Sequence, residues 1–285
     1  MANDLDAKVF LVTGGTEGIG KAAVMDFAKR GATIALVGRN AEKTERVASE
    51  VKSASGNSRI EVNIGDLSKM ADVRNVATQF RASHDRLDVL VNNAGAVFLE
   101  RQLSADGIEM TFALNHIAYF LLTHEVMDLL KKTPGARVVS TSSNGHRGGS
   151  LSDLDEVAHR AKSFGGWRAY CDSKLANVHF TRELARRLAP GATANCVHPG
   201  YVQTGFGLNN TGVMRALMKF SGGLFARTPE KGAETLIWLA TSHEAAGFNG
   251  EYFFDRKPGA KSSLAVNDVL AARLWAYSEM LCGLS

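Results

Sequence analysis

Short apolar runs alternate with amphipathic stretches along most of this chain of 285 residues. The runs are bounded by turn residues and are too short for buried helices, so they indicate strands. The predicted strands are Lys8–Val12, Thr33–Val37, Arg59–Ile64, Leu87–Val91, Ala136–Thr141, Ala194–His198 and a last one near Gly250–Phe254. Helical patterns lie between them, among others at Glu42–Ala54, Met70–Ser83, Phe112–Leu130, Tyr170 to Pro190 and Glu230–Thr241. This alternation predicts an α/β fold, with helices on both faces of one doubly wound parallel sheet of about seven strands.

A glycine-rich loop, Thr13 to Gly20 (TGGTEGIG), joins the first predicted strand to a predicted helix. Glycines let a backbone approach phosphate groups closely, and a helix N-terminus adds free N–H groups and the positive end of a dipole. Glycine-rich runs also serve as plain turns, but a position between a strand and a helix indicates a dinucleotide pyrophosphate site. The pattern is typical of a single Rossmann domain, here spanning residues 1–285.

The residue after the second strand bears on the choice of cofactor. In this architecture an acidic side chain there binds the ribose 2′-hydroxyl of NAD, whereas a basic one accommodates the 2′-phosphate of NADP. This chain has Gly38-Arg39-Asn40 and no acidic residue at that point. Arg39 therefore favours NADP over NAD, unless it is only a solvated loop residue.

Tyr170 and Lys174 lie four residues apart in a predicted helix, so their side chains share a face. A phenol has a pKa of about 10 and is a poor base at neutral pH. A nearby ammonium group lowers that pKa, which lets the phenol exchange a proton with a substrate oxygen. Because such pairs also occur on ordinary surface helices, the interpretation depends on the rest of the chain.

Composition narrows the classes of protein that fit. Hydrophobic residues make up 45% and charged residues 22% of the chain, which is typical of a globular protein. The net charge of +4 is dispersed rather than gathered in a basic stripe, so we expect no nucleic-acid partner. No apolar run approaches the ~20 residues of a membrane span, and the N-terminus does not resemble a signal peptide. Three scattered cysteines without metal-ligand spacing lead us to expect a cytoplasmic protein without a metal site.

Further motifs follow the later strands in a fixed order. They are Asn92-Asn93-Ala94-Gly95, then Asn115, Ser143, the run Tyr170-Cys171-Asp172-Ser173-Lys174, and Pro199-Gly200-Tyr201-Val202-Gln203-Thr204. Together with the glycine loop, this order resembles the short-chain dehydrogenase/reductase family over roughly residues 8 to 255. The runs KLANVHFTRELARRL and HPGYV are similar to the retinol dehydrogenase-like branch of that family.

The resemblance implies an enzyme that interconverts a carbonyl and an alcohol by hydride transfer with NADP(H). It implies that Ser143 donates a hydrogen bond to the substrate carbonyl, and that Tyr170 is the general acid in reduction and the general base in oxidation. It also implies that Lys174 holds the nicotinamide ribose and lowers the pKa of Tyr170, while Asn115 positions a water in the proton relay. The cofactor-binding residues expected, besides Tyr170 and Lys174, are Gly14, Thr16, Gly18, Ile19, Gly20, Arg39, Asp66, Leu67, Asn92, Ala94, Gly95, Pro199, Gly200, Val202 and Thr204.

Two features depart from the commonest pattern of the family. Many NADP-using members have a basic residue just before the second motif glycine, where this chain has Glu17, whose carboxylate would weaken binding of a 2′-phosphate. The interval between Ser143 and Tyr170 is also longer than usual. We therefore expect residues Gly145–Trp167 to form a lobe on the substrate side.

Two segments lie beyond the shared motifs. Residues 205–228 carry helically spaced Leu and Met side chains between glycine pairs, which predicts a mobile apolar lid over a lipophilic or aromatic substrate. The alternative is a helix that packs permanently on the core or on a second subunit. Leu264–Leu281 has the pattern of a C-terminal helix that caps the domain or makes a subunit contact, so a homodimer and a homotetramer both remain open.

Two other functions fit the same fold. A regulatory protein that senses NADP(H) without turnover is expected to have lost the tyrosine, lysine or serine, and this chain keeps all three. A sugar-nucleotide epimerase or dehydratase is disfavoured by the modest length and by the glycine spacing of TGGTEGIG. The sequence therefore favours an oxidoreductase acting on a small molecule, with the silent NADP(H) sensor as the alternative.

Overall fold

The computed structural model describes residues 3–202 and 227–284. Within these ranges, eight strands form one sheet in the order β3-β2-β1-β4-β5-β6-β7-β8, with every pairing parallel except that of β7 with β8. The predicted doubly wound sheet is confirmed, and its eighth strand arises because the chain turns back after β7 for two residues. The strands are β1 Val9–Thr13, β2 Thr33–Gly38, β3 Ile60–Ile64, β4 Val89–Asn92, β5 Arg137–Thr141, β6 Thr193–Val197, β7 Tyr252–Phe254 and β8 Lys257–Pro258.

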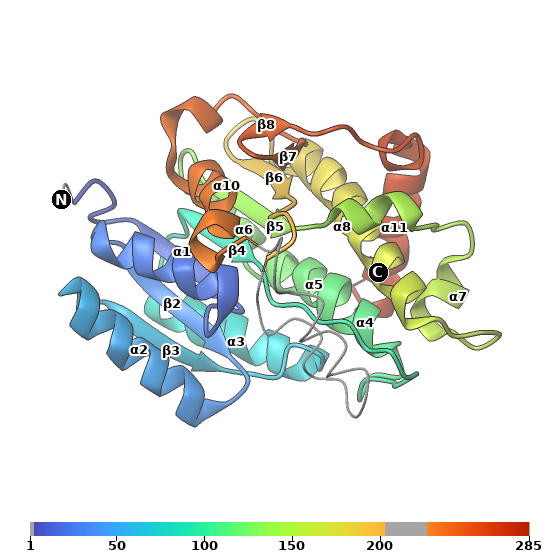
Figure 1. Ribbon diagram of the computed structural model, residues 1–285, viewed down its shortest axis with the longest axis horizontal. Coiled ribbons are helices and arrows are strands. Elements are labelled where there is room, and N and C mark those ends of the chain that lie inside the picture. Colours follow the sequence, from blue (N-terminus) through green and yellow to red (C-terminus); the bar gives the residue numbers. More distant parts are fainter. Residues whose placement is uncertain (1–2, 203–226, 285) are drawn as a thin grey trace.

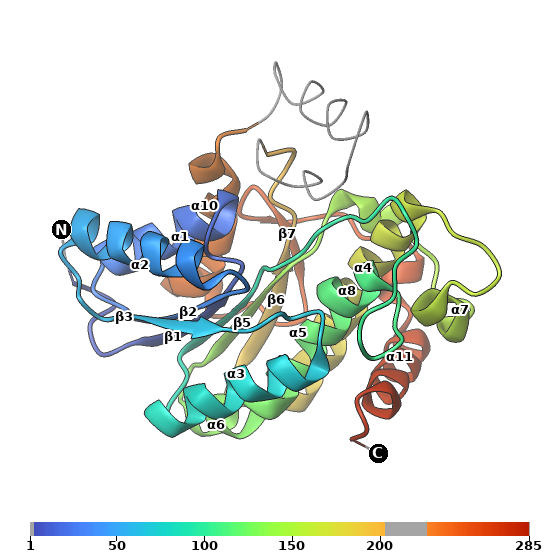
Figure 2. The same cartoon turned by 90° about the horizontal axis from the view of Figure 1, so that it is seen from below.

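Helices cover both faces of the sheet, as Figures 1 and 2 show. One face carries α1 (Gly18–Lys29), α2 (Ala41–Ser55) and α10 (Pro229–Thr241); the other carries α3 (Met70–Ser83), α5 (Ala118–Glu125), α6 (Met127–Lys132) and α8 (Gly166–Leu188). Alternate side chains of β1 divide between two cores: Phe10 and Val12 pack toward α1, whereas Val9 and Leu11 pack toward α5 and α8. Burial on both faces explains why the strands read as continuous apolar runs.

The strand order places the functional loops. β1 pairs with β2 on one side and with β4 on the other, so the order of strands reverses at β1. In doubly wound sheets, ligands bind outside the carboxyl ends of the strands at this point of reversal. The loops after β1 and β4 hold the glycine-rich run and Asn92–Gly95, so both motifs meet at that edge.

The prediction of one continuous helix over Phe112–Leu130 is wrong. The chain forms a short helix α4 (Met110–Phe112), a π-helical turn η1 (Ala113–Ile117), then α5 and α6. A π turn inserts one residue into a helix, and such turns are frequent at functional sites. Asn115 lies inside this turn.

The expected lobe and tail both have helical structure. Residues after Ser143 form a 3₁₀ turn η2 (Asn144–Gly148) and helix α7 (Leu154–His159), and α8 already begins at Gly166. The tail begins with a 3₁₀ turn η4 (Leu264–Val266), and helix α11 (Asp268–Leu281) starts only after Asn267, whose side chain accepts from the N–H of Leu270. Helix α11 packs on α8, with Trp275 stacked on Phe180 at 6.0 Å between ring centres. The tail therefore packs on the chain's own core, and its expected role in a subunit contact stays a prediction.

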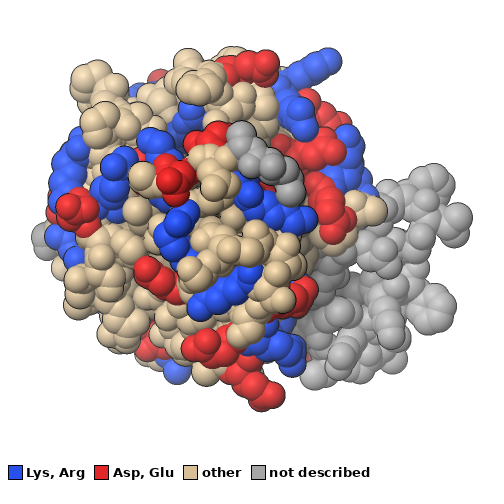
Figure 3. All heavy atoms as spheres, turned by 90° about the vertical axis from the view of Figure 1, so that its left-hand side faces the viewer, with Lys and Arg blue, Asp and Glu red and all other residues tan. Residues whose placement is uncertain are grey.

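The described surface carries mixed charge. On the face in Figure 3, basic and acidic side chains are interspersed, in agreement with the dispersed net charge of the sequence. No helix in residues 3–202 or 227–284 combines the length and apolar character needed to cross a bilayer. Thr204 and all but the last two residues of the predicted lid 205–228 lie outside the described residues.

Candidate active site

The glycine loop after β1 packs more tightly than any side chain would permit. Gly14 has φ +66°, and a Cβ there would lie 2.7 Å from the Cα of Ala94. A Cβ on Gly20 would lie 2.1 Å from the carbonyl oxygen of Gly14. Helix α1 then begins after Glu17, whose side chain makes no cap, so the N–H groups of its first turn remain available to an anion. These features fit a dinucleotide pyrophosphate.

Asn93 holds this loop in place, a role that the sequence analysis missed. Its side-chain nitrogen donates to the carbonyl oxygens of Thr13 at 3.2 Å and Gly14 at 3.1 Å, and its oxygen accepts from the hydroxyl of Thr141 at 3.1 Å. Asn93 therefore joins the ends of β1, β4 and β5. The expected cofactor residue Asn92 is instead fully buried, and its side chain donates to Thr123 on α5. The two side chains point to opposite faces because side chains alternate along a strand, and the role of Asn92 toward a cofactor stays a prediction.

Residues far apart in the sequence meet beside the glycine loop. A Cβ on Gly232, in α10, would lie 2.8 Å from Cγ2 of Ile19 and 2.5 Å from Cγ2 of Val202. The run after β6 thus reaches the start of α1, as expected for one continuous cofactor site. Gly200 has φ +84°, and a Cβ there would collide with the side chain of Arg227. The partly exposed Pro199 precedes it.

The charges around the end of β2 fit a 2′-phosphate. Arg39 is exposed and makes no hydrogen bond or ion pair with the residues that the structure describes. The unfavourable Glu17 pairs with Lys43, its carboxylate 2.6 Å from the ammonium nitrogen. Lys43 therefore balances the negative charge of Glu17, which would otherwise disfavour the 2′-phosphate of NADP. Both partners are substantially exposed, so this pair matters for local charge rather than for stability.

The turn after β3 holds the two residues expected at the adenine. Asp66 is half-buried and accepts hydrogen bonds from the N–H and hydroxyl of Ser68, at 3.2 and 2.8 Å. The N–H of Asp66 donates to Asp72 in the first turn of α3. Leu67 is buried. These bonds fix the turn, which leaves the role of both residues toward a cofactor as a prediction.

Tyr170, Ser143 and Lys174 converge at the carboxyl end of β5. The ammonium nitrogen of Lys174 lies 5.6 Å from the centre of the Tyr170 ring and donates to the carbonyl oxygen of Thr141 at 3.2 Å. Ser143 makes a side-chain hydrogen bond with Tyr170 and accepts from the N–H of Gly145 at 3.1 Å. Tyr170 and Lys174 are both buried, whereas Ser143 is half-buried. A phenol, a hydroxyl and an amine thus surround one point.

Ser142 and Ser143 could not be told apart by chemistry in the sequence. The hydroxyl of Ser142 is buried and donates to the backbone oxygen of Lys174 at 2.8 Å. The hydroxyl of Ser143 instead faces the phenol of Tyr170. The geometry therefore favours Ser143 as the hydroxyl that could reach a substrate.

Burial changes the protonation behaviour of the pair. It raises the pKa of Tyr170 to about 12, and the hydrogen bond from Ser143 offsets only part of that rise. It also lowers the pKa of Lys174 to about 7. The expected lowering of the tyrosine pKa is therefore wrong for the protein alone. A lysine with such a pKa is only partly charged at neutral pH, so it attracts a phenolate less than an ordinary ammonium does.

Asn115 joins three parts of the site. Its side-chain oxygen accepts from the N–H of Ala96, and its nitrogen donates to the oxygen of Ala96, both at 2.9 Å, and to Ser173 Oγ at 3.1 Å. Its backbone oxygen accepts from Asn177 Nδ2 at 2.9 Å. A Cβ on Gly95 would lie 2.9 Å from Asn115 Oδ1 and 3.6 Å from Lys174 Nζ. The amide therefore fixes the loop after β4 against α8, and its expected role in positioning a water remains a prediction.

Replacing Lys174 by methionine is expected to stabilise the fold. Because burial lowers its pKa, the unfolded chain binds that proton more tightly than the folded one. The cost is fully present below about pH 7 and is relieved as the pH rises toward about 10. We expect a gain of about 0.5–2 kcal/mol in unfolding free energy, larger at pH 6 than at pH 9. Denaturant unfolding measures it, with the exposed Lys131→Met as the matched control; an equal gain at both pH values would contradict it.

In the described part of the chain, no group of three His, Cys, Asp or Glu side chains is placed to hold a metal ion. The site therefore consists of hydroxyls, one amine and amides beside a glycine loop. Asn93, Ser173 and Asn177 belong to it although the motifs did not single them out as site residues. Each lies within or just beyond a motif, and this position is the signal in the sequence by which they could have been identified.

Many known proteins are similar to this chain in sequence. The short chain dehydrogenase family profile matches residues 8–153. Retinol dehydrogenase 13 of Homo sapiens is 35% identical over 286 residues, which cover 98% of this chain and 86% of that protein. Retinol dehydrogenase 11 of Homo sapiens is 38% identical over 281 residues, covering 98% and 87%.

Solved structures of similar proteins have the same fold. A protein from Mycobacterium Paratuberculosis superposes with a TM-score of 0.78 at 28% identity, covering 98% of this chain and 94% of that one. A short chain dehydrogenase from Escherichia coli CFT073, complexed with NADPH, superposes with a TM-score of 0.69 at 28% identity, covering 89% and 98%. The chain therefore belongs to the short-chain dehydrogenase/reductase family, in its retinol dehydrogenase-like branch, and is an NAD(P)-dependent oxidoreductase acting on CH–OH or C=O groups.

Proposed function

We propose that this chain interconverts a lipophilic or aromatic carbonyl and its alcohol with NADP(H), through Ser143, Tyr170, Lys174 and Asn115. The observation that carries the proposal is the contact of the Ser143 hydroxyl with the buried Tyr170, beside Lys174 and the glycine loop. The cofactor, when bound, supplies or accepts the hydride at the carbonyl carbon. The protein must then position the carbonyl and transfer one proton to or from its oxygen.

Tyr170 is suited to donate that proton in reduction. With its pKa at about 12, the phenol is protonated at neutral pH and can donate to the oxygen on which negative charge develops. Ser143 can donate a second hydrogen bond to the same oxygen, which stabilises the charge electrostatically. Lys174 lies close enough to Tyr170 to favour the phenolate that remains. In oxidation the phenolate takes the alcohol proton back.

Preference for NADP is supported by the exposed Arg39 and by the pairing of Glu17 with Lys43. A related structure from Shigella flexneri was solved with NADP, and the Escherichia coli one with NADPH. A guanidinium is a good partner for a phosphate because it presents several donors in a planar fork.

Arg39→Asp is expected to shift the preference from NADPH toward NADH. The change replaces an attractive contact with a repulsive one, and charged hydrogen bonds are worth ~1.5–3 kcal/mol. We therefore expect NADPH to bind about 10–100-fold more weakly, measured by fluorescence titration. Arg46→Asp, on an exposed position of α2, makes the same change of charge as a control. An unchanged ratio of NADPH to NADH affinity in Arg39→Asp would mean that Arg39 does not contact the phosphate.

The substrate class is supported by one exposed aromatic side chain at the site and a second in the run after β6. Trp167 is 59% exposed and its ring stacks on Tyr170, with 5.2 Å between centres and 30° between planes. Tyr201, after β6, is 56% exposed. Exposed aromatic surface beside a buried polar group is characteristic of small-molecule sites.

A panel of ketones and alcohols, followed by NADPH absorbance, tests the proposed function. We expect kcat/KM to rise with the apolar area of the substrate, by up to ~0.8 kcal/mol per buried methylene. Faster turnover of small polar sugars than of bulky apolar carbonyls would overturn the substrate class. Tight NADPH binding without turnover of any compound would favour the silent NADP(H) sensor instead.

A further inference from the structure

Arg160 occupies an unusual place in the lobe between Ser143 and Tyr170. It ends helix α7 with φ 52° and ψ 43°, a left-handed conformation in which glycine is the usual residue. Its side chain is nevertheless long, charged and only 8% exposed. The guanidinium is therefore buried here although the left-handed backbone and the loss of hydration both disfavour such a residue.

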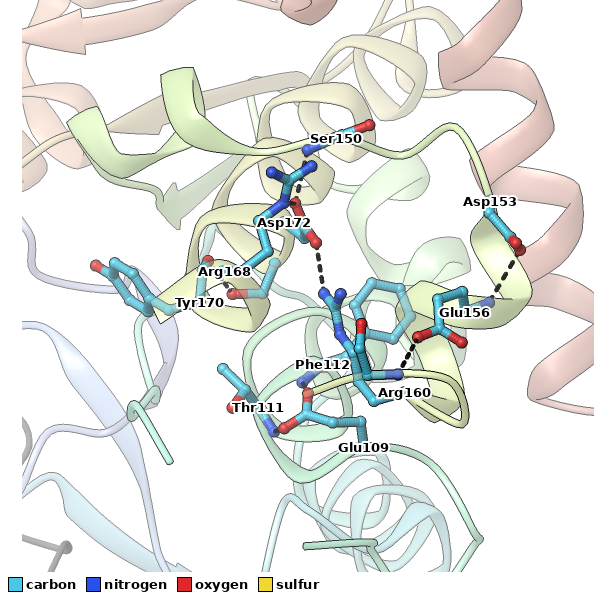
Figure 4. Close-up of polar contacts among 12 residues, drawn as sticks. Glu109, Thr111, Phe112, Ser150, Asp153, Glu156, Arg160, Arg168, Tyr170 and Asp172 are labelled. Atoms are coloured by element: carbon cyan, nitrogen blue, oxygen red, sulfur yellow. Dashed lines mark hydrogen bonds and ion pairs between the residues drawn. The ribbon is translucent and has the colours of Figure 1, made fainter. Parts of the chain in front are cut away.

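Asp172 is the first partner of this guanidinium. It lies in α8 between Tyr170 and Lys174 and is 1% exposed. Its carboxylate accepts from Arg160, from the N–H of Ser150 at 2.6 Å and from Nε of Arg168 at 3.1 Å. Figure 4 shows that Asp172 and Tyr170 point away from α8 in different directions. The carboxylate therefore holds the side of the helix that faces away from the phenol.

Glu109 is a second buried carboxylate near the same cation. It has no exposed surface, and its two oxygens accept from the N–H groups of Thr111 and Phe112, each at 2.9 Å (Figure 4). These bonds cap α4, which continues into the π turn that carries Asn115. Burial raises the pKa of Glu109; the bonds from Thr111 and Phe112 and, least of all, the positive charge of Arg160 oppose that rise. The backbone N–H of Glu109 also donates to the oxygen of Ala158 in α7, at 2.7 Å.

We propose that Arg160 is a positioning residue, whose guanidinium sets the first turns of α8 against the helix that carries Asn115. The inference rests on the proposed function, because it concerns the alignment of Tyr170 with Asn115 and Ser143. The guanidinium pairs with Asp172 in α8, the helix of Tyr170. Helix α7, which Arg160 ends, is bonded through the backbone oxygen of Ala158 to Glu109, the cap of α4. Arg168 binds the same Asp172, but it is 54% exposed and lies one turn away on α8 itself, so within the described residues it joins no second element.

Loss of Arg160 leaves Asp172 buried with only an exposed cation in reach. A buried charge without its partner is costly, so the first turns of α8 are expected to shift until water reaches the carboxylate. A displacement of about 1 Å at reacting groups can cost ~100-fold in rate. The cofactor loop lies on other elements, so the affinity for NADPH should change little.

The test compares Arg160→Met with Arg168→Met in the full-length protein. We expect kcat to fall about 10–100-fold in Arg160→Met, with the dissociation constant of NADPH nearly unchanged, and to stay close to wild type in Arg168→Met. Arg160→Lys keeps the charge and should recover much of the loss. Both substitutions remove one guanidinium from the same carboxylate, so equal losses in the two variants would overturn the proposal.

A second measurement does not depend on turnover. Trp167 stacks on Tyr170 in the first turns of α8, so its emission reports their geometry. We expect Arg160→Met to shift the emission of Trp167, obtained by subtracting the spectrum of the same variant with Trp167→Phe, and Arg168→Met to leave it unchanged. Without turnover in the wild type the proposed function fails, and this emission alone decides the role of Arg160. Should Arg160→Met not fold, the isosteric Asp172→Asn replaces it, and wild-type kcat and emission in that variant would overturn the proposal.

Discussion

Tyr170→Phe is expected to lower kcat by about 10²–10⁴-fold while NADPH binds almost as well as before. The substitution removes the only atom of this side chain that can donate a proton and leaves the ring in place. The ring stacks on Trp167 and lies near the ammonium of Lys174, so these contacts persist without the hydroxyl. Steady-state kinetics and a fluorescence titration of NADPH measure the two effects separately.

A second tyrosine near the same lysine provides a matched control. The ring centre of Tyr119 is 5.9 Å from Lys174 Nζ, and its buried hydroxyl has no partner among the described residues. Burial raises the pKa of Tyr119 further than that of Tyr170, so it is a poorer proton donor. Tyr119→Phe should therefore leave kcat nearly unchanged. If Tyr170→Phe kept more than about a tenth of the wild-type kcat, the proton would come from elsewhere.

The raised pKa of Tyr170 also sets an expected pH dependence. Reduction requires the protonated phenol, which is the main form at every pH below about 12, so Tyr170 itself should add no pH dependence to its rate from pH 6 to 9. An inflection near pH 7 would report the titration of Lys174. Oxidation requires the phenolate, which is scarce in that range. Its kcat/KM should rise with pH, by up to about tenfold per unit while the phenolate is the minor form. An oxidation rate that falls as the pH rises would contradict Tyr170 as the base.

Much of the fold could be predicted because burial on both faces makes the strands continuous apolar runs. Val9–Thr13 and Thr33–Gly38 are recognisable by that property alone, and glycine or polar residues mark where they end. The two-residue strand β8 has no such pattern, since Lys257 and Pro258 are exposed and pair only with the end of β7. The π turn at Asn115 likewise has no local trace, because helical spacing continues through it.

The site was predictable in its parts but not in its energetics. Motif order brought Ser143, Tyr170 and Lys174 together correctly, because each follows or precedes a predicted strand or helix at the same edge. The direction of the tyrosine pKa could not be predicted, because it depends on how far the fold excludes water from both groups. The bonding of Asn93 to Gly14 also depends on contacts between strands that are distant in the sequence.

Substitutions of the two adjacent serines should separate an effect on catalysis from an effect on stability. Ser143→Ala removes a hydroxyl that contacts Tyr170, and loss of one donor to a developing oxyanion costs about 10²–10³-fold in kcat. The N–H of Gly145 also loses its acceptor, but it lies in a half-buried turn where water can replace the hydroxyl. We therefore expect a large loss of kcat with little change in unfolding free energy.

Ser142→Ala should have the opposite effect. Its hydroxyl is buried and donates to the backbone oxygen of Lys174, so removing it should lower the unfolding free energy by about 0.5–1.5 kcal/mol. The alanine leaves the hydroxyl of Ser143 in contact with Tyr170, so kcat should stay close to the wild-type value. Steady-state kinetics and denaturant unfolding of both variants measure this crossed pattern. A larger loss of kcat in Ser142→Ala than in Ser143→Ala would show that the substrate hydroxyl had been assigned to the wrong serine.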